Sequence, residues 1–307
     1  MPIVHGAIAA GNENTAAAGI EMLRQGGNAF DAAVAAVLAA TVAEPCLTSI
    51  AGGGFLLAHT HDNRNLLFDF FTQTPRQKRS PQGVDFYPVE VDFGTTTQEF
   101  HVGLGSMAVP GTLAGLMHIH ERLGRLPFKA VVEPAVHYAQ TGVTVDAFQA
   151  YCFKILQPIW LGSEEARQAI APTGMLPQAG DVLTFGNLAN TLLYLAEEGG
   201  RAFYQGDIAQ QLVNDCQARG GYLSLDDLRH YRVIERQPLT LSYRGTTFLT
   251  NPPPSSGGAL IAFALSLLSS VDWRDIDFGS RAHQHILADV MRLTNLARKD
   301  GYDARLY

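Results

Sequence analysis

The stretch Asn28–Phe55 reads NAFDAAVAAVLAATVAEPCLTSIAGGGF, and the rest of the chain is organised around it. Its alanine-rich run predicts a helix, because alanine has the highest helix propensity. The run is apolar on nearly every face, so the helix is expected to lie buried between other layers. Pro45 ends it, because proline has no N–H and disfavours helix in the residue before it. The glycines at 52–54 then permit close backbone approaches ahead of a strand.

Apolar spacing and turn residues predict the remaining elements. Strands are expected at 5–10, 55–60, 66–71, 100–109, 239–243 and 246–250, and helices at 15–25, 112–123, 127–140, 188–197, 207–218, 259–268 and 282–298. Residues 147–172 are expected to be helical and 76–94 irregular, and serines are expected to cap the short helix near 224 and the helix at 259–268. This pattern predicts a layered α/β (α+β) fold, with residues 1–307 in a single domain.

Composition excludes several classes of partner. The chain has 307 residues, a net charge of −7 and only 17% charged residues, with no run of lysine and arginine, which argues against nucleic acid and anionic membrane. No apolar run reaches transmembrane length. The start, MPIVHGAIAAGNEN, lacks signal-peptide features, so a cytoplasmic location is expected, or a periplasmic or extracellular one if a leader has been removed. Cys46, Cys152 and Cys216 are expected to be reduced thiols without structural zinc.

Several motifs that would carry chemistry are either absent from the sequence or have a structural interpretation. The chain has no nucleophile elbow, P-loop or dinucleotide fingerprint, so no cofactor is expected. His59 and His61 flank a turn without a third ligand, so no metal is expected. The stretch Gly94–Phe100 offers a threonine after glycine, which suits an N-terminal nucleophile, but a polar loop that enters a strand is the favoured interpretation. Pro252–Gly258 is interpreted as a rigid helix entry, and anion binding at its amides is the alternative.

A series of short motifs, in a fixed order along almost the whole chain, resembles the large (N-terminal) subunit of the γ-glutamyltranspeptidase family. The matching pieces are Gly26–Ala33, Glu44-Pro45, Gly52–Phe55, Val109–Gly111, Glu133–Ala135, Ala202–Gly206, Gly220–Leu223, Asp226–Leu228 and Pro252–Gly258. The resemblance implies an N-terminal nucleophile hydrolase fold, an αββα sandwich. It also implies a precursor that cuts itself in two, with the attacking threonine at the start of the small subunit.

Under this resemblance no catalytic residue lies in this chain, and the partners are the threonine-bearing small subunit and a small-molecule amide. An αβ heterodimer, or a dimer of these, is expected. Gly53, Gly54, Phe71 and Gln73 are the candidate substrate-binding residues. An isolated large subunit would expose unpaired strand edges and apolar faces, so obligate association with the missing chain is predicted.

One departure from the family pattern concerns substrate choice. The family has an arginine that binds the substrate α-carboxylate where this chain has Phe71, and Arg76 or Arg79 lies at a different spacing. Phe71 therefore either lines a pocket for an apolar or aromatic acyl group, as in acylase relatives, or is a core aromatic with the pocket rearranged around it. True γ-glutamyl transfer, including glutathione hydrolysis, and a non-catalytic scaffold are the alternative functions.

Overall fold

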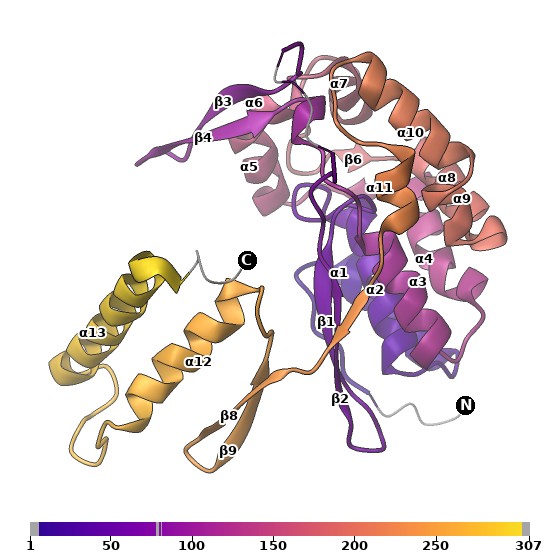
Figure 1. The fold of residues 1–307 in the computed structure, drawn as a ribbon. Helices are drawn as coiled ribbons and strands as arrows, with labels where there is room; N and C mark the ends of the chain where they lie inside the picture. The colour runs from indigo at the N-terminus through magenta and orange to yellow at the C-terminus, as the bar shows by residue number, and fades with distance from the viewer. Residues whose placement is uncertain (1–5, 78–79, 81, 303–307) are drawn as a thin grey trace. The chain divides into compact units, whose positions relative to one another are not determined.

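The computed structural model describes residues 6–77, 80 and 82–302. The described residues divide into two compact units, one within Met1–Gly54 and Phe70–Val233 and the other within Phe55–Asp69 and Ile234–Tyr307. Figure 1 labels their helices and strands. Within the described residues, no helix combines the length and the apolar character that a membrane crossing requires.

The first unit is mainly helical. Its helices are α1 (Glu13–Arg24), α2 (Ala29–Ala43), α3 (Thr112–Leu123), α4 (Phe128–Thr141), α5 (Ala147–Ile155), α6 (Gln157–Trp160), α7 (Glu164–Ile170), α8 (Gly186–Glu198), α9 (Gly200–Tyr204), α10 (Asp207–Ala218) and α11 (Leu225–His230). Its strands form two antiparallel pairs, β3 (Tyr87–Asp92) with β4 (Thr97–Val102) and β5 (Val143–Thr144) with β6 (Val182–Leu183). The helices expected near 15–25, 112–123, 127–140, 188–197 and 207–218 are confirmed.

The central helix α2 is buried on nearly all sides, as its composition predicts. A capping box starts it: the Asn28 side chain accepts hydrogen bonds from the backbone N–H groups of Phe30 and Asp31, and Asp31 accepts one from Asn28 N at 2.8 Å. The helix packs against α1, α3 and α4. It ends at Ala43, ahead of Glu44 and Pro45. Small alanine side chains permit this packing against several neighbours at once.

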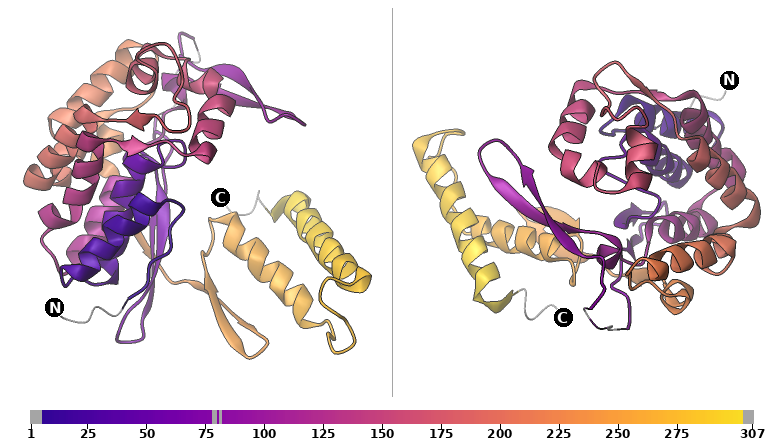
Figure 2. Two further views of the ribbon diagram at one scale, coloured as in Figure 1. Left: turned by 180° about the vertical axis from the view of Figure 1, so that it is seen from behind. Right: turned by 90° about the horizontal axis from the view of Figure 1, so that it is seen from above.

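Two expected strands of the first unit are wrong in part. Residues 6–10 form no strand; Ile8 instead lies over Gly19 of α1, and His5 lies outside the described residues. The strand expected at 100–109 is β4, which ends at Val102 because Gly103 adopts φ 99° and a 3₁₀ turn follows. Its partner β3 occupies part of the stretch expected to be irregular. This β3–β4 hairpin extends away from the helices of its unit (Figure 2).

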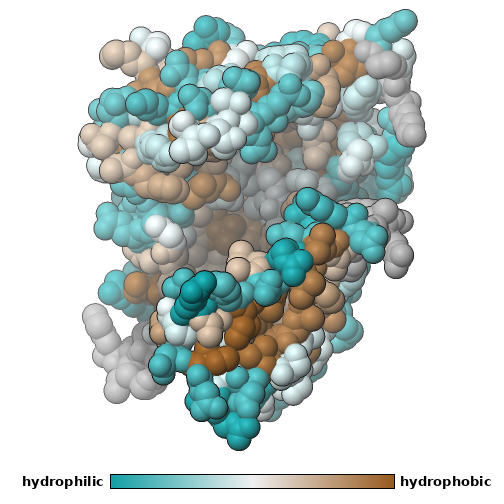
Figure 3. All heavy atoms as spheres, turned by 90° about the vertical axis from the view of Figure 1, so that its left-hand side faces the viewer, coloured by the Kyte–Doolittle hydropathy of each residue, from teal (hydrophilic) through white to brown (hydrophobic). Residues whose placement is uncertain are grey.

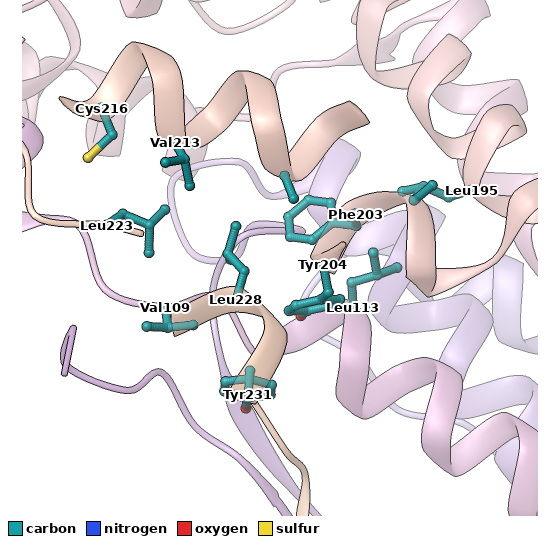
Figure 4. Close-up of a cluster of buried hydrophobic side chains, with 12 residues drawn as sticks. Val109, Leu113, Leu195, Phe203, Tyr204, Val213, Cys216, Leu223, Leu228 and Tyr231 are labelled. Atoms are coloured by element: carbon teal, nitrogen blue, oxygen red, sulfur yellow. The ribbon is translucent and has the colours of Figure 1, made fainter. Parts of the chain in front are cut away.

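A hydrophobic cluster fills the space between α3, α9, α10 and α11 (Figure 4). Leu113 of α3, Phe203 and Tyr204 of α9, and Leu228 and Tyr231 at α11 are among its buried members. Tyr204 and Tyr231 stack with their ring centroids 5.8 Å apart and their planes 19° apart. This cluster supports the backbone of the candidate site described below.

The second unit contains a sheet, a hairpin and two long helices. Strands β1 (Gly54–His59), β2 (Asn65–Phe70) and β7 (Ile234–Arg236) form a sheet in that order, and β8 (Leu239–Tyr243) pairs with β9 (Thr246–Thr250). Helices α12 (Ser256–Ser269) and α13 (Arg281–Ala297) pack together, and a π-helical turn, Arg298–Tyr302, follows. Inside the sheet, Arg236 Nε donates to Asp69 Oδ2 at 2.7 Å. The strands and helices expected here are confirmed.

The entry to α12 differs from the expectation in two respects. Ser255 is the N-cap residue, but its side chain makes no capping hydrogen bond. Close packing is confirmed for Gly258, where a Cβ would lie 2.0 Å from the carbonyl oxygen of Asn251, but not for Gly257, where a Cβ would meet nothing within 4 Å. Backbone approach therefore determines this turn, and a serine hydroxyl does not.

The helical surface of the second unit is apolar. Figure 3 shows hydrophobic side chains gathered over it. The large apolar residues of α12 and α13 that are exposed are Ile261, Phe263, Leu287, Met291, Leu293 and Leu296. An apolar surface of this extent is typical of a face that another polypeptide covers.

Candidate functional site

The candidate site is built on an extended segment, Phe70–Gln73, that glycines hold from two sides. A Cβ on Gly53 would lie 2.5 Å from Thr72 N, and a Cβ on Gly111 would lie 2.0 Å from the carbonyl oxygen of Phe70. Both approaches are far closer than any side chain allows, so only glycine fits at either position. The backbone of the segment is therefore fixed by direct contact with other backbone.

The same packing continues around the ring of Phe70. A Cβ on Gly115 would lie 2.1 Å from this ring, and a Cβ on Gly54 would lie 3.0 Å from it. Phe70 itself is buried. These contacts anchor the segment immediately before Phe71.

Phe71 combines a held backbone with an exposed side chain. Its carbonyl oxygen accepts a hydrogen bond from the Tyr231 hydroxyl at 2.9 Å, and Tyr231 is itself buried. The Phe71 side chain is 56% exposed. Phe71 is therefore outside the buried core of the described residues, and its part in substrate binding stays a prediction.

The backbone of Gln73 is held by a pair of hydrogen bonds to Val109, an isolated antiparallel bridge. Its N–H donates to the carbonyl of Val109 at 3.2 Å, and Val109 N–H donates back to the Gln73 carbonyl at 2.7 Å. Gly52 joins the start of α3 to this region, because its carbonyl accepts from Gly111 N at 2.7 Å and Thr112 N at 3.0 Å. Gly53, Gly54, Phe71 and Gln73 thus lie together in one part of the first unit.

Asp227 holds the loop that follows the segment. This buried carboxylate accepts hydrogen bonds from Arg76 N at 2.8 Å, Ser224 N at 2.9 Å and Ser224 Oγ at 2.6 Å. The Arg76 side chain is exposed, and Arg79 lies outside the described residues. The Ser224 hydroxyl also caps α11, as expected from the sequence. Asp227 therefore links a helix start to the site loop, a role that the sequence did not indicate.

Two histidines of the described chain make structural contacts. His120 contacts the Leu126 carbonyl through Nε2 at 2.8 Å, and His59 Nδ1 lies 2.9 Å from the Asn65 side-chain oxygen. Among the described residues, no group of three or more His, Cys, Asp and Glu side chains could hold a metal ion. The 94–100 stretch is a turn that leads into β4, as the favoured interpretation held.

The cysteines of the described chain are free thiols. Burial is the main cause that raises the pKa of Cys46 to about 11; nearby Cys152 raises it further, and the neighbouring Trp160 side chain opposes the rise. Because the thiolate is the reactive form of cysteine, such a pKa makes Cys46 a poor nucleophile near neutral pH.

Comparison with known proteins identifies the family. The gamma-glutamyltranspeptidase family profile matches residues 15–305. The chain belongs to the gamma-glutamyltranspeptidase family. It is 33% identical over 301 residues to the glutathione hydrolase proenzyme of Escherichia coli K12, covering 98% of this chain and 50% of that protein. It is also 34% identical over 282 residues to the acylase ACY 1 proenzyme of Pseudomonas sp. strain V22, covering 90% of this chain and 50% of the relative.

A solved structure shows that the fold is also that of the family. The gamma-glutamyltranspeptidase of Helicobacter pylori superimposes with a TM-score of 0.85 at 28% identity, covering 97% of this chain and 85% of that chain. The layered α/β class expected from the sequence is thereby confirmed. The chain spans about half the length of the curated relatives it matches.

The sequence did not indicate that Tyr231 and Asp227 bind the backbone of the site by hydrogen bonds. Tyr231 carried no signal, because a lone tyrosine after a short helix is ordinary. Asp227 lies in the Asp226–Leu228 motif, but its position in a first helical turn suggested only a favourable dipole interaction. The capping-box spacing from Ser224 to Asp227 was the signal that could have shown this carboxylate turning back toward the chain.

Proposed function

We propose that this chain is the large-subunit part of a gamma-glutamyltranspeptidase-like amidohydrolase that acts on an apolar or aromatic acyl group. In this proposal residues 1–307 form one domain that a threonine-bearing small subunit completes. The match to 85% of a solved Helicobacter pylori chain, against 50% of a proenzyme, supports the correspondence to one processed chain. The apolar surface of α12 and α13 supports association with a second chain.

The exposed Phe71 side chain is the observation that carries the substrate class. Its backbone is held by glycine contacts and by Tyr231, while its ring remains accessible. An aromatic ring offers no donor for a carboxylate, whereas it packs well against an apolar acyl group. Gln73, two residues further along the same segment, supplies amide donors and an acceptor that suit the polar part of an acyl substrate.

The reaction follows from the chemistry of an N-terminal threonine. The threonine hydroxyl of the partner chain attacks the amide carbonyl and loses its proton to the free α-amine, which passes that proton to the leaving amine. The resulting ester is cleaved by water or by an acceptor amine, which restores the hydroxyl. This chain contributes no catalytic residue to these steps. Gly53, Gly54, Phe71 and Gln73 position the acyl group.

The first experiment is intact mass and N-terminal sequencing of the natively purified protein. A second chain that begins with threonine is expected. A protein without such a chain supports the non-catalytic scaffold instead. Kinetics of a phenylacetyl anilide against a γ-glutamyl anilide then test the substrate class, and the phenylacetyl compound is expected to have the higher kcat/KM.

Phe71→Arg is the decisive variant. It restores a cation able to bind an α-carboxylate and is expected to shift the kcat/KM ratio toward the γ-glutamyl anilide by about tenfold or more. Phe148→Arg is the matched control, because Phe148 is 58% exposed on α5 and lies outside the site. An unchanged ratio in Phe71→Arg, or a wild-type preference for the γ-glutamyl anilide, would favour glutathione hydrolysis or γ-glutamyl transfer, as in the relatives named glutathione hydrolase.

A further inference from the structure

A pocket separate from the candidate site lies in the first unit, between α3, α9 and α11. It has a volume of about 510 Å³, within the range of small-molecule sites. None of Gly53, Gly54, Phe71 and Gln73 lines it. The proposed amidohydrolase reaction therefore assigns no task to this pocket.

The floor of the pocket is apolar and rigid. Tyr204, Leu228 and Tyr231 are all buried, and Met117 adds a flexible apolar side chain. Figure 4 shows the two tyrosines and Leu228 together. The Tyr204 hydroxyl donates to the Pro110 carbonyl at 3.0 Å, and the Tyr231 hydroxyl donates to the Phe71 carbonyl. Because both hydroxyls are bonded to backbone, the tyrosines offer the pocket mainly ring carbons in a fixed arrangement.

The rim of the same pocket is positively charged. Arg201 of α9, Arg229 of α11 and Arg232 line it, together with His118 and one carboxylate, Glu121, of α3. Arg232 Nη1 donates to the carbonyls of Arg229 and Tyr231, both at 2.7 Å, which holds this guanidinium at the rim. No ion pair joins Arg201 or Arg229 to another residue in the described part of the chain.

The positive charge at the rim of this pocket is opposite in sign to the net charge of the chain. The protein has a net charge of −7, yet three of its arginines and only one carboxylate line this pocket. Guanidinium groups bind carboxylate and phosphate through paired N–H donors, and a local excess of positive charge raises the concentration of anions near it. A rigid apolar floor lowers the ordering cost of binding a matching apolar body.

We propose that the pocket between α3, α9 and α11 binds a small amphipathic anion. Its apolar body, of about the size of one aromatic ring, lies on Tyr204, Leu228 and Tyr231, and its carboxylate or phosphate head pairs with Arg201 and Arg229. The pairing is non-covalent and leaves the ligand unchanged. It does not depend on the identity of the acyl substrate.

Titration of the natively purified protein with phenyl phosphate, followed by calorimetry or ligand-observed NMR, tests this proposal. We expect a dissociation constant of about 1 mM or lower. Phenol, which lacks the charge, and inorganic phosphate, which lacks the ring, are each expected to bind about tenfold more weakly. Equal binding of phenyl phosphate and inorganic phosphate would overturn the proposal, because the apolar floor would then contribute nothing.

Variants assign the binding to this pocket. The double variant Arg201→Gln/Arg229→Gln is expected to weaken phenyl phosphate binding about tenfold or more, whereas Arg24→Gln, at another exposed arginine, is expected to leave it unchanged. Glu121→Gln removes the carboxylate and is expected to tighten binding severalfold, which gives a test of opposite sign should the double variant fold poorly. Binding that none of the pocket variants alters would place the anion elsewhere and refute the proposal.

Discussion

Gly53→Ala tests whether backbone contact holds the candidate site. A Cβ at this position would lie 2.5 Å from Thr72 N, 2.9 Å from the Phe71 carbonyl carbon and 3.0 Å from the Phe70 carbonyl oxygen, and ordinary contact begins at 3.4 Å. The two backbones must separate by about 0.9 Å at the closest atom, and no side chain can rotate to relieve this. Overpacking of this kind costs about 1–3 kcal/mol. A gain of about 0.4–1 kcal/mol from the stiffer unfolded chain offsets part of it.

The expected net loss in unfolding free energy is therefore about 1–2 kcal/mol, measured by urea denaturation. Amide hydrolysis is expected to fall about tenfold or more, because displaced positioning groups lower the rate steeply. Gly186→Ala is the matched control: Gly186 is exposed at the start of α8, and a Cβ there meets nothing within 4 Å. It is expected to be neutral or slightly stabilising. If Gly53→Ala matches Gly186→Ala in both stability and hydrolysis, the account of the clamped segment is wrong.

Three further outcomes follow from individual contacts. Tyr231→Phe removes the hydroxyl that donates to the Phe71 carbonyl and should lower the unfolding free energy by about 1 kcal/mol and raise KM, as urea denaturation and anilide kinetics would show. Asp31→Asn replaces one carboxylate oxygen with an NH2 group, so either the backbone N–H of Asn28 or those of Arg125 and Leu126 lose their acceptor, and it should cost about 2 kcal/mol or more, measured in the same way. The pKa of Cys46 is raised from 9.0 to about 11, so the unfolded chain releases this proton first, and the unfolding free energy should fall between pH 9 and pH 11. Cys46→Ala should remove that part of the alkaline loss; an identical pH profile in the variant would contradict the assignment.

The elements with strong local signals could be predicted from the sequence. The cap at Asn28 and the break at Pro45 bracket α2, and Arg244-Gly245 marks the turn between β8 and β9. The strand β3 was missed because Pro88 and acidic residues interrupt its alternation, and its stability depends on pairing with β4, a contact between segments that local pattern does not reveal. Strand assignment depends on such neighbours more than helix assignment does.

The candidate site was predictable in part for the same reason. The glycines at 53 and 54 indicated close approach, and the structure identifies the approaching segment as Phe70–Thr72. The residues behind that segment were beyond local reasoning, since Tyr231 is 160 positions from Phe71 in sequence and the two meet only through the folded chain. Spacing alone could not distinguish a buried Phe71 from an exposed one, and exposure is the property that decides its role.

In this site, the groups that fix the backbone are different from the side chains proposed to contact a ligand. Gly53 and Gly111 hold the segment by backbone contact, and Tyr231 holds the Phe71 carbonyl, so none of these interactions uses the side chain at position 71. Under the proposed function, a substitution there changes the chemistry presented to a ligand, while the glycine contacts and the Tyr231 hydrogen bond remain. We therefore expect position 71 to allow a change between carboxylate and apolar recognition at little cost in stability. This accords with a family whose curated relatives include both glutathione hydrolases and acylases.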